Sequence, residues 1–180
     1  MKNFQLIAAG VDVTPLLHAV MRQPELWNEN RLRTTYHETP HAEADDIWLW
    51  FNAADDAATV ADDCDTVPYP AWQALPQARP IVFDLMHRVG GSRLGRVLIT
   101  RLAPGKSITP HADAGAPAEY YSRYQVALQS LPGCLFTAGG ETVTFRPGEV
   151  WYFNNKLTHS VVNNSADDRV VMIVDIRVAP

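Results

Sequence analysis

The pattern of hydrophobic and polar positions changes near Ser92. After this position, short apolar runs rich in β-branched and aromatic residues alternate with polar turn segments. Such runs are typical of strands rather than helices. The pattern predicts seven strands, over residues 96–101, 123–129, 135–137, 142–145, 150–153, 159–162 and 170–178.

Turn signals separate these strands. Pro-Gly pairs stand at 104–105, 132–133 and 147–148, and Gly139-Gly140 suits a two-residue hairpin turn that needs positive φ angles. Many short strands with turns between them are typical of a β-sandwich or a small barrel. The expected fold class is therefore an all-β core with flanking helices.

The first half of the chain has a mixed pattern. Apolar positions predict helices over residues 14–21 and 81–89, and β-branched and aromatic runs predict strands over 33–37 and 47–51. The polar, acidic segment 52–70 is expected to be a surface loop. A chain of 180 residues is most simply one domain, 1–180, with support elements in 1–91 and the β core in 92–180.

Composition narrows the classes of function. The hydrophobic fraction of 47% predicts a packed core, and the net charge of −5 without a basic run argues against nucleic acid as a partner. Two isolated cysteines favour a reducing compartment. The short apolar stretch near the N-terminus does not suit a secretory signal, and no run is long enough to span a membrane, so a cytoplasmic protein is expected.

The candidate chemistry lies in the predicted β core. In an extended strand, residues i and i+2 point to the same side, so His111 and Asp113 can reach one ion. His159, at the predicted start of a later strand, can supply a third ligand. Two imidazoles and one carboxylate with the other coordination positions open is the ligand set that suits non-haem Fe(II) oxygenases.

A near copy of this motif occurs earlier in the chain. Thr-Pro-His41-Ala-Glu43 echoes Thr-Pro-His111-Ala-Asp113, so a His-x-acid pair alone is weak support for a metal site. The segment around His41 is polar, and no arginine follows a suitable third ligand there. The later pair is favoured because Arg169 stands ten residues after the third candidate ligand and can hold an acidic co-substrate.

The second half of the chain resembles a known family over about residues 92–178. Its motifs are Arg101-Leu-Ala-Pro-Gly-Lys-Ser-Ile-Thr-Pro-His111-x-Asp113, then Arg123, Gly148-Glu-Val-Trp-Tyr-Phe-Asn-Asn-x3-His159-x-Val-x-Asn163 and Arg169-x4-Val174-Asp175. Together they resemble the aspartyl/asparaginyl β-hydroxylases, which are Fe(II)- and 2-oxoglutarate-dependent dioxygenases. The resemblance implies a double-stranded β-helix, also called a jelly roll or cupin-like fold.

The resemblance also implies roles by position. His111 and His159 match the iron histidines, and Asp113 resembles the carboxylate of members with two His and one carboxylate. Arg169 matches the arginine that binds the far carboxylate of 2-oxoglutarate, and Arg123 resembles a second co-substrate contact. The family's Arg-x-His element ends here in a glutamine, residue 125.

The reaction implied by the resemblance is hydroxylation of an unactivated C–H bond, coupled to decarboxylation of 2-oxoglutarate by O2. The substrate is expected to be amino-acid-like or a peptidyl Asp or Asn side chain, so that small molecules and peptides are both candidates. The alternative is a cupin-like metal-binding protein, an isomerase or a sensor, without oxygenase activity. The sequence says nothing of the oligomeric state.

Several neighbouring residues have simpler interpretations. Asn154 and Asn155 are expected to shape the turn before the third ligand. His41 and its neighbour His37 fit a solvated loop better than a substrate contact. The sequence does not decide whether His37, His41, Trp50 or Gln125 contacts the substrate or the co-substrate.

Overall fold

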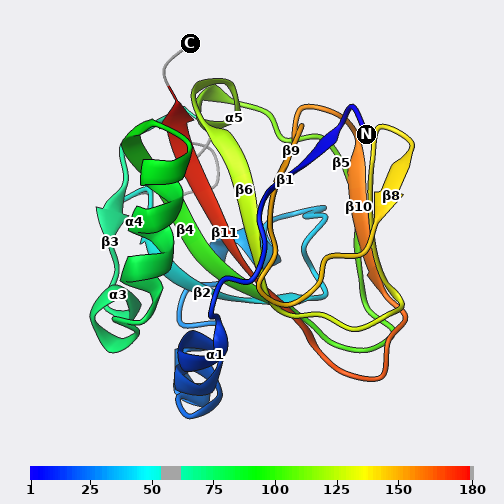
Figure 1. Cartoon of the computed structure of the whole chain (residues 1–180), viewed down its shortest axis with the longest axis horizontal. Helices are drawn as coiled ribbons and strands as arrows, with labels where there is room; N and C mark the ends of the chain where they lie inside the picture. Colours follow the sequence, from blue (N-terminus) through cyan, green and yellow to red (C-terminus); the bar gives the residue numbers. More distant parts are fainter. Residues whose placement is uncertain (54–61, 179–180) are drawn as a thin grey trace.

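Two antiparallel sheets face each other in the computed structural model, which describes residues 1–53 and 62–178 (Figure 1). The larger sheet has the strand order β1 (Phe4–Ala8), β9 (Val150–Phe153), β6 (Ser122–Gln129), β11 (Arg169–Val178), β4 (Gly91–Leu102), β2 (Ala44–Phe51) and β3 (Val67–Pro68). The smaller sheet has the order β5 (Ser107–His111), β10 (His159–Asn163), β7 (Cys134–Ala138) and β8 (Glu141–Val143).

The chain crosses repeatedly between the two sheets. From β4 to β11, it runs through the larger sheet, the smaller, the larger, the smaller twice, the larger, the smaller and the larger again. Strands that alternate in this way wind into a double-stranded β-helix. The predicted jelly-roll fold is confirmed, and β1, β2 and β3 extend its larger sheet on both sides.

Helices cover the outer face of the larger sheet, opposite the smaller sheet (Figure 1). They are α1 (Thr14–Met21), α3 (Ala71–Ala74) and α4 (Ala78–Arg88); a 3-10 turn (Pro24–Leu26), α2 (Leu32–Thr35) and α5 (Ala116–Tyr120) are shorter elements. None of the helices in the described part of the chain is long and apolar enough to cross a membrane.

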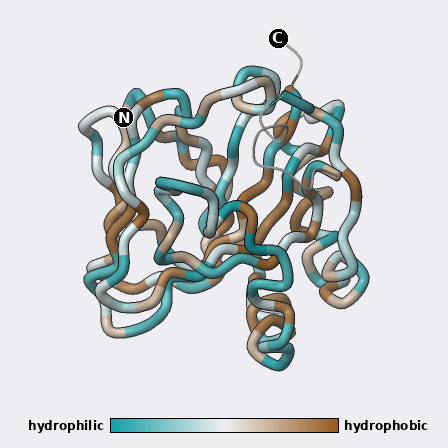
Figure 2. Tube along the Cα trace, turned by 180° about the vertical axis from the view of Figure 1, so that it is seen from behind, coloured by the Kyte–Doolittle hydropathy of each residue, from teal (hydrophilic) through white to brown (hydrophobic). Residues whose placement is uncertain are grey.

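Strand β11 separates two hydrophobic layers. Met172 packs into the layer under the helices, whereas Val171 and Ile173 face the other side of the sheet. Inside the roll, a third cluster includes Phe4, Leu102, Ile108, Phe136 and Phe153. In Figure 2 the hydrophobic stretches follow the strands at the centre of the molecule, and many outer loops are hydrophilic. These layers hold the central strands, and therefore the side chains at their ends, in fixed positions.

Most predicted elements are present. The helix expected over 14–21 is α1, and the helix expected over 81–89 is α4, which begins three residues earlier. The seven strands predicted after Ser92 all occur, one of them (150–153) with the predicted bounds and the other six with shifted ends. The hairpin between β7 and β8 turns at Gly139 and Gly140, whose φ angles of 54° and 83° suit glycine.

The corrections concern the N-terminal half and strand β5. The strand predicted over 33–37 is wrong, because Leu32–Thr35 forms the short helix α2. The hydroxyls of Thr34 and Thr35 both donate to the carbonyl of Arg31, a local contact that competes with strand pairing. The strands β1 and β5 were not predicted; both lie at sheet edges, where Pro110 is tolerated in β5. Of the expected loop 52–70, residues 54–61 lie outside the described residues, and Val67–Pro68 forms β3.

Candidate metal and co-substrate site

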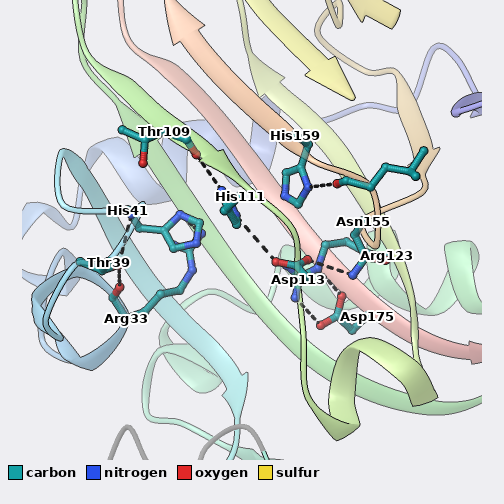
Figure 3. A network of polar contacts seen from close by, with 11 residues as sticks. Arg33, Thr39, His41, Thr109, His111, Asp113, Arg123, Asn155, His159 and Asp175 are labelled. Carbon is teal, nitrogen blue, oxygen red and sulfur yellow. Dashed lines mark hydrogen bonds and ion pairs between the residues drawn. The ribbon is translucent and has the colours of Figure 1, made fainter. Parts of the chain in front are cut away.

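The three candidate metal ligands converge at one end of the roll. His111 ends β5 and His159 begins β10, and these two residues are directly paired across the antiparallel strands. Asp113 follows β5, and the ligand atoms of the three side chains all lie within 4.8 Å of one another. Figure 3 shows them pointing toward a common centre. No other group of three such side chains occurs within residues 1–53 and 62–178.

Both imidazoles are oriented by backbone carbonyls. The Nδ1 atom of His111 lies 2.8 Å from the carbonyl oxygen of Thr109, and that of His159 lies 2.9 Å from the carbonyl of Leu157. A carbonyl only accepts, so each Nδ1 carries the proton and each Nε2 keeps a free lone pair. The Nε2 atom of His111 is buried without a hydrogen-bond partner in the described structure.

The electrostatics of the site keep the imidazoles neutral. Burial lowers the pKa of His159 to about 4 and lowers the pKa of His111 as well. Metal ligation requires deprotonated ligands, and a neutral imidazole with an unused Nε2 lone pair meets this requirement. The two histidines therefore fit a divalent metal such as Fe(II).

Asp113 is held by two donors on one oxygen. Its Oδ2 accepts hydrogen bonds from Nη1 of Arg123 at 2.7 Å and from Nδ2 of Asn155 at 2.9 Å. Its Oδ1 lies 3.7 Å from Nε2 of His111 and faces the triad. Burial raises the pKa of Asp113, but Arg123, His159 and the amide donor outweigh it, so that the net pKa is lowered. The carboxylate is ionised, with one oxygen available to a metal.

Arg123 occupies a position between two carboxylates. Besides Asp113, its guanidinium donates from Nε and Nη2 to the two oxygens of Asp175 at 2.8 and 2.9 Å. Burial lowers the pKa of Arg123, but the two carboxylates raise it further, so the net pKa lies above its ordinary value. The sequence-based expectation placed Arg123 against the co-substrate; the structure places it against the carboxylate of the metal triad.

Asn155, which the sequence analysis expected to shape the turn before His159, contacts the carboxylate of Asp113. Its amide holds the carboxylate of Asp113, and its carbonyl accepts the Asp113 backbone N–H at 2.9 Å. The side chain of Asn154 instead accepts from the backbone N–H of Lys156, as expected for a turn residue. Asn155 therefore orients the carboxylate, because Asp113 lies beyond the end of β5 and no strand pairing fixes it.

We expect Asn155→Ala to lower Fe(II) affinity by roughly 10- to 100-fold, the usual effect of removing a hydrogen-bond partner of a metal ligand. The backbone contact to Asp113 remains in this variant, so the fold should be intact. The measurement is an anaerobic Fe(II) titration, with Asn154→Ala as the matched control. Equal Fe(II) affinity in both variants would show that Asn155 does not orient the ligand.

Arg169 lies deep in the roll, at the beginning of β11. Its side chain packs against the rings of Phe136 and Phe145, and its Nη2 donates to Oε1 of Gln125 at 2.9 Å. It is 2% exposed, and burial lowers its pKa to about 10. No carboxylate of the described residues pairs with it. A buried cation that meets only a neutral amide can bind an anionic ligand.

Two cavities adjoin the triad. A cavity of about 380 Å³ lies at the mouth of the roll and is lined by His111, Asp113, Arg123 and apolar side chains, among them Leu32, Tyr36, Phe51, Leu98 and Ile173. A smaller cavity of about 20 Å³ lies further inside, and His111, His159, Gln125 and Arg169 are among the residues that line it. The triad thus stands between an inner space that ends at a cation and an outer space with a largely apolar wall.

The near copy of the ligand motif, which contains His41 and Glu43 and is called the echo motif below, does not lie in a solvated loop as expected. His41 is buried rather than solvated, and its ring lies edge-on to that of His111, with ring centroids 4.8 Å apart. Glu43 points elsewhere, because its carboxylate binds Lys106 and Ser107. His41 and Glu43 therefore do not form a second metal site in the described structure. This agrees with the sequence analysis, which favoured His111 and Asp113 as the metal ligands.

The structure also places His37, Trp50 and Gln125, whose contacts the sequence did not decide. The side chain of His37 is 91% exposed, which fits the expected solvated loop. Trp50 packs against Trp72, with ring centroids 5.9 Å apart, so it belongs to the layer under the helices. Gln125 contacts Arg169 rather than the triad.

Comparisons with known proteins agree with this geometry. The family model described as aspartyl/asparaginyl beta-hydroxylase matches residues 22–178. The chain belongs to the aspartyl/asparaginyl β-hydroxylase family. It is accordingly a 2-oxoglutarate-dependent dioxygenase that uses Fe(II), and the predicted family, enzyme class and cofactors are confirmed. The match also includes much of the N-terminal half, beyond the motifs that carried the resemblance.

Solved structures show the same fold at low sequence identity. A 2OG-Fe(II) oxygenase family protein from Burkholderia pseudomallei is 15% identical, with a TM-score of 0.55 over 74% of this chain and 67% of that one. A prolyl hydroxylase from Trichoplax adhaerens, in complex with a hypoxia-inducible factor peptide, is 13% identical, with a TM-score of 0.60 over 97% and 83%. The viral collagen prolyl hydroxylase of Paramecium bursaria Chlorella virus-1, in complex with 2-oxoglutarate, is 11% identical, with a TM-score of 0.54 over 99% and 97%.

Proposed function

We propose that this dioxygenase hydroxylates an unactivated C–H bond of an amino-acid-like substrate, free or as a peptidyl Asp- or Asn-type side chain. In this proposal His111, Asp113 and His159 hold Fe(II), and Arg169 binds the distal carboxylate of 2-oxoglutarate. The observation that carries it is the arrangement of two neutral imidazoles and a carboxylate around one centre. Further inside lies a buried arginine that no carboxylate of residues 1–53 and 62–178 pairs with.

The protein's own residues have separable tasks in this proposal. Arg169 binds the co-substrate at its far end, because a planar guanidinium matches the two oxygens of a carboxylate. Arg123 positions Asp113 instead of contacting the co-substrate, since carboxylates already occupy its described contacts. Phe136 and Phe153 pack against the ring of His159, and these two aromatic side chains exclude water from the inner space. Bound iron supplies the activation of O2.

The outer cavity is where we place the substrate. It opens beside His111 and Asp113, and its volume of about 380 Å³ is in the range of small-molecule sites. Its wall combines apolar side chains with arginines, which suits a substrate with an aliphatic part and a polar group. The cavity lies at the mouth of the roll, so a free amino acid and a side chain presented by a peptide both fit this proposal.

The experiment is a substrate panel with the iron-loaded protein. We expect 2-oxoglutarate-dependent formation of succinate together with an equimolar, singly oxygenated product from at least one member. The panel contains free amino acids, N-acetylated amino acid amides and peptides with Asp, Asn and Pro. Coupled turnover with a peptide but not with the free residue would assign a peptidyl substrate.

The alternative function, a cupin-like metal-binding isomerase or sensor, predicts a different result. Such a protein would bind metal but would not consume 2-oxoglutarate under any condition. The buried Arg169 favours the oxygenase, because a site without an anionic ligand has no use for an unneutralised cation in its interior. Absence of 2-oxoglutarate binding to the metal-loaded protein would favour the alternative.

A further inference from the structure

A third histidine, His41, adjoins the proposed metal site without belonging to the triad. It precedes β2 and is held against β5, because the backbone N–H of Thr109 donates to the carbonyl of Pro40 at 3.1 Å. Its ring meets that of His111 edge-on at 4.8 Å. Figure 3 shows the ring between Arg33 and His111. His41 also lines both cavities, including the inner one that ends at Arg169.

A chain of polar contacts determines the tautomer of His41. Nη2 of Arg33 lies 3.0 Å from Nδ1 of His41. A guanidinium has no acceptor, so Nδ1 must accept this hydrogen bond and the imidazole proton must be on Nε2. Arg33 is itself fixed by Asp46, at 2.6 and 2.7 Å, and Asp46 accepts from Thr100 at 2.8 Å. Because Nδ1 accepts from Arg33 and only Nε2 carries a proton, the ring of His41 is neutral in this arrangement.

The result is one oriented donor with no assigned acceptor. The Nε2–H of His41 has no hydrogen-bond acceptor among residues 1–53 and 62–178, although the residue is only 8% exposed. The Nε2 atom itself is not enclosed by protein atoms, and His41 lines both cavities, so a ligand or water in this space can accept the hydrogen bond. The buried ion pair with Asp46 fixes the position of Arg33. The contact between Arg33 and Nδ1 of His41 in turn fixes the direction in which the Nε2–H of His41 points.

We propose that His41 is a further co-substrate-binding residue, whose Nε2–H donates a hydrogen bond to a carboxylate oxygen of 2-oxoglutarate. The inference rests on the proposed function and adds a contact to it. A dicarboxylate that extends from the triad to Arg169 would pass through the inner cavity, whose wall includes His41; this cavity has a volume of about 20 Å³, so its side chains would have to move apart to admit the ligand. The low exposure of His41 favours this inner ligand over a substrate in the outer cavity.

The test compares two variants of His41 with a matched control. In His41→Phe, which fills the same space without a donor, we expect 2-oxoglutarate to bind roughly 10- to 100-fold more weakly, the size of a hydrogen bond to a charged group. In His41→Gln, the side-chain carbonyl can accept from Arg33 while the amide donates, so most of the affinity should return. The exposed His37→Phe, in the same segment, should bind as the wild type does.

The measurement is anaerobic titration of 2-oxoglutarate into Mn(II)-loaded protein, with Mn(II) content measured in parallel. Unchanged affinity in His41→Phe, or equal losses in the Phe and Gln variants, would overturn the proposal. Loss of coupled hydroxylation with unchanged 2-oxoglutarate affinity would also overturn it, because His41 would then contact the substrate. If the wild type itself does not bind 2-oxoglutarate, the proposed function fails too, and the wild-type titration tells the two failures apart.

A second measurement does not depend on the stability of a variant. In protein with ¹⁵N-labelled histidine, loaded with diamagnetic Zn(II), we expect His41 to show a protonated Nε2 and an unprotonated, hydrogen-bonded Nδ1. Addition of 2-oxoglutarate should shift the Nε2–H signal in the direction of a stronger hydrogen bond. A His41 signal that does not respond, while the co-substrate binds, would contradict the proposed contact.

Discussion

Arg169→Ala is expected to weaken 2-oxoglutarate binding by roughly 30- to several-thousand-fold, with a much smaller change in Fe(II) affinity. Truncating one partner of a buried, hydrogen-bonded charge pair costs about 2–5 kcal/mol. The guanidinium is buried against two aromatic rings and reaches the inner cavity, whereas the candidate metal ligands lie on β5, just past its end, and on β10. The measurement is calorimetric titration of 2-oxoglutarate into the metal-loaded variant under anaerobic conditions.

Two comparisons make this result specific. Arg169→Lys should restore only part of the affinity, because a single ammonium cannot reproduce the two parallel hydrogen bonds of a guanidinium. Arg101→Ala, on β4, removes an arginine that pairs with Asp45 at the protein surface, and it should leave 2-oxoglutarate affinity unchanged. Wild-type affinity in Arg169→Ala would place the co-substrate anchor elsewhere.

His159→Ala is expected to lose most of its Fe(II) affinity while it retains its fold. The loss should exceed the roughly 10- to 100-fold effect of an outer hydrogen-bond partner, because a bond to the metal itself is removed. His111→Ala and Asp113→Ala should behave alike, since each supplies one of three ligand atoms that lie within 4.8 Å of one another. The measurement is iron content after anaerobic reconstitution, with circular dichroism to check the fold.

The control for this series is His18→Ala. His18 is an exposed residue of helix α1, away from the site, and its variant should retain one iron per chain. Glu43→Ala, from the echo motif, should also retain iron, because its carboxylate binds Lys106 and Ser107. Full iron retention in His159→Ala would contradict the ligand assignment.

The convergence of the triad was predictable because it depends on local regularities. Short strands with Pro-Gly and Gly-Gly turns predict a roll, and a His at the start of a later strand can pair with one at the end of an earlier strand. The structure pairs His111 directly with His159. The i, i+2 spacing was only part of the explanation, because Asp113 lies past the end of β5 and is oriented by Asn155 and Arg123.

The contacts that were missed depend on distant parts of the chain. Arg33, expected on a strand, lies on α2 and pairs with Asp46 of β2, which brings His41 against the triad. The hydrophobic pattern of a single segment cannot predict this contact between His41 and His111, because it depends on residues from three separate elements. The pair Asp45-Asp46, directly before the aromatic strand predicted over 47–51, was a usable signal, because a charge next to a buried strand needs a partner when the strand extends to include it. Nothing local distinguished Asn155 from the turn residue Asn154.

A crystal structure of the protein with Mn(II) and 2-oxoglutarate, grown without oxygen, tests the central claim most directly. The account predicts one metal ion bound by Nε2 of His111, Nε2 of His159 and a carboxylate oxygen of Asp113. The distal carboxylate of 2-oxoglutarate should lie on the guanidinium of Arg169. A metal bound by other residues, or a co-substrate carboxylate that does not contact Arg169, would contradict the account.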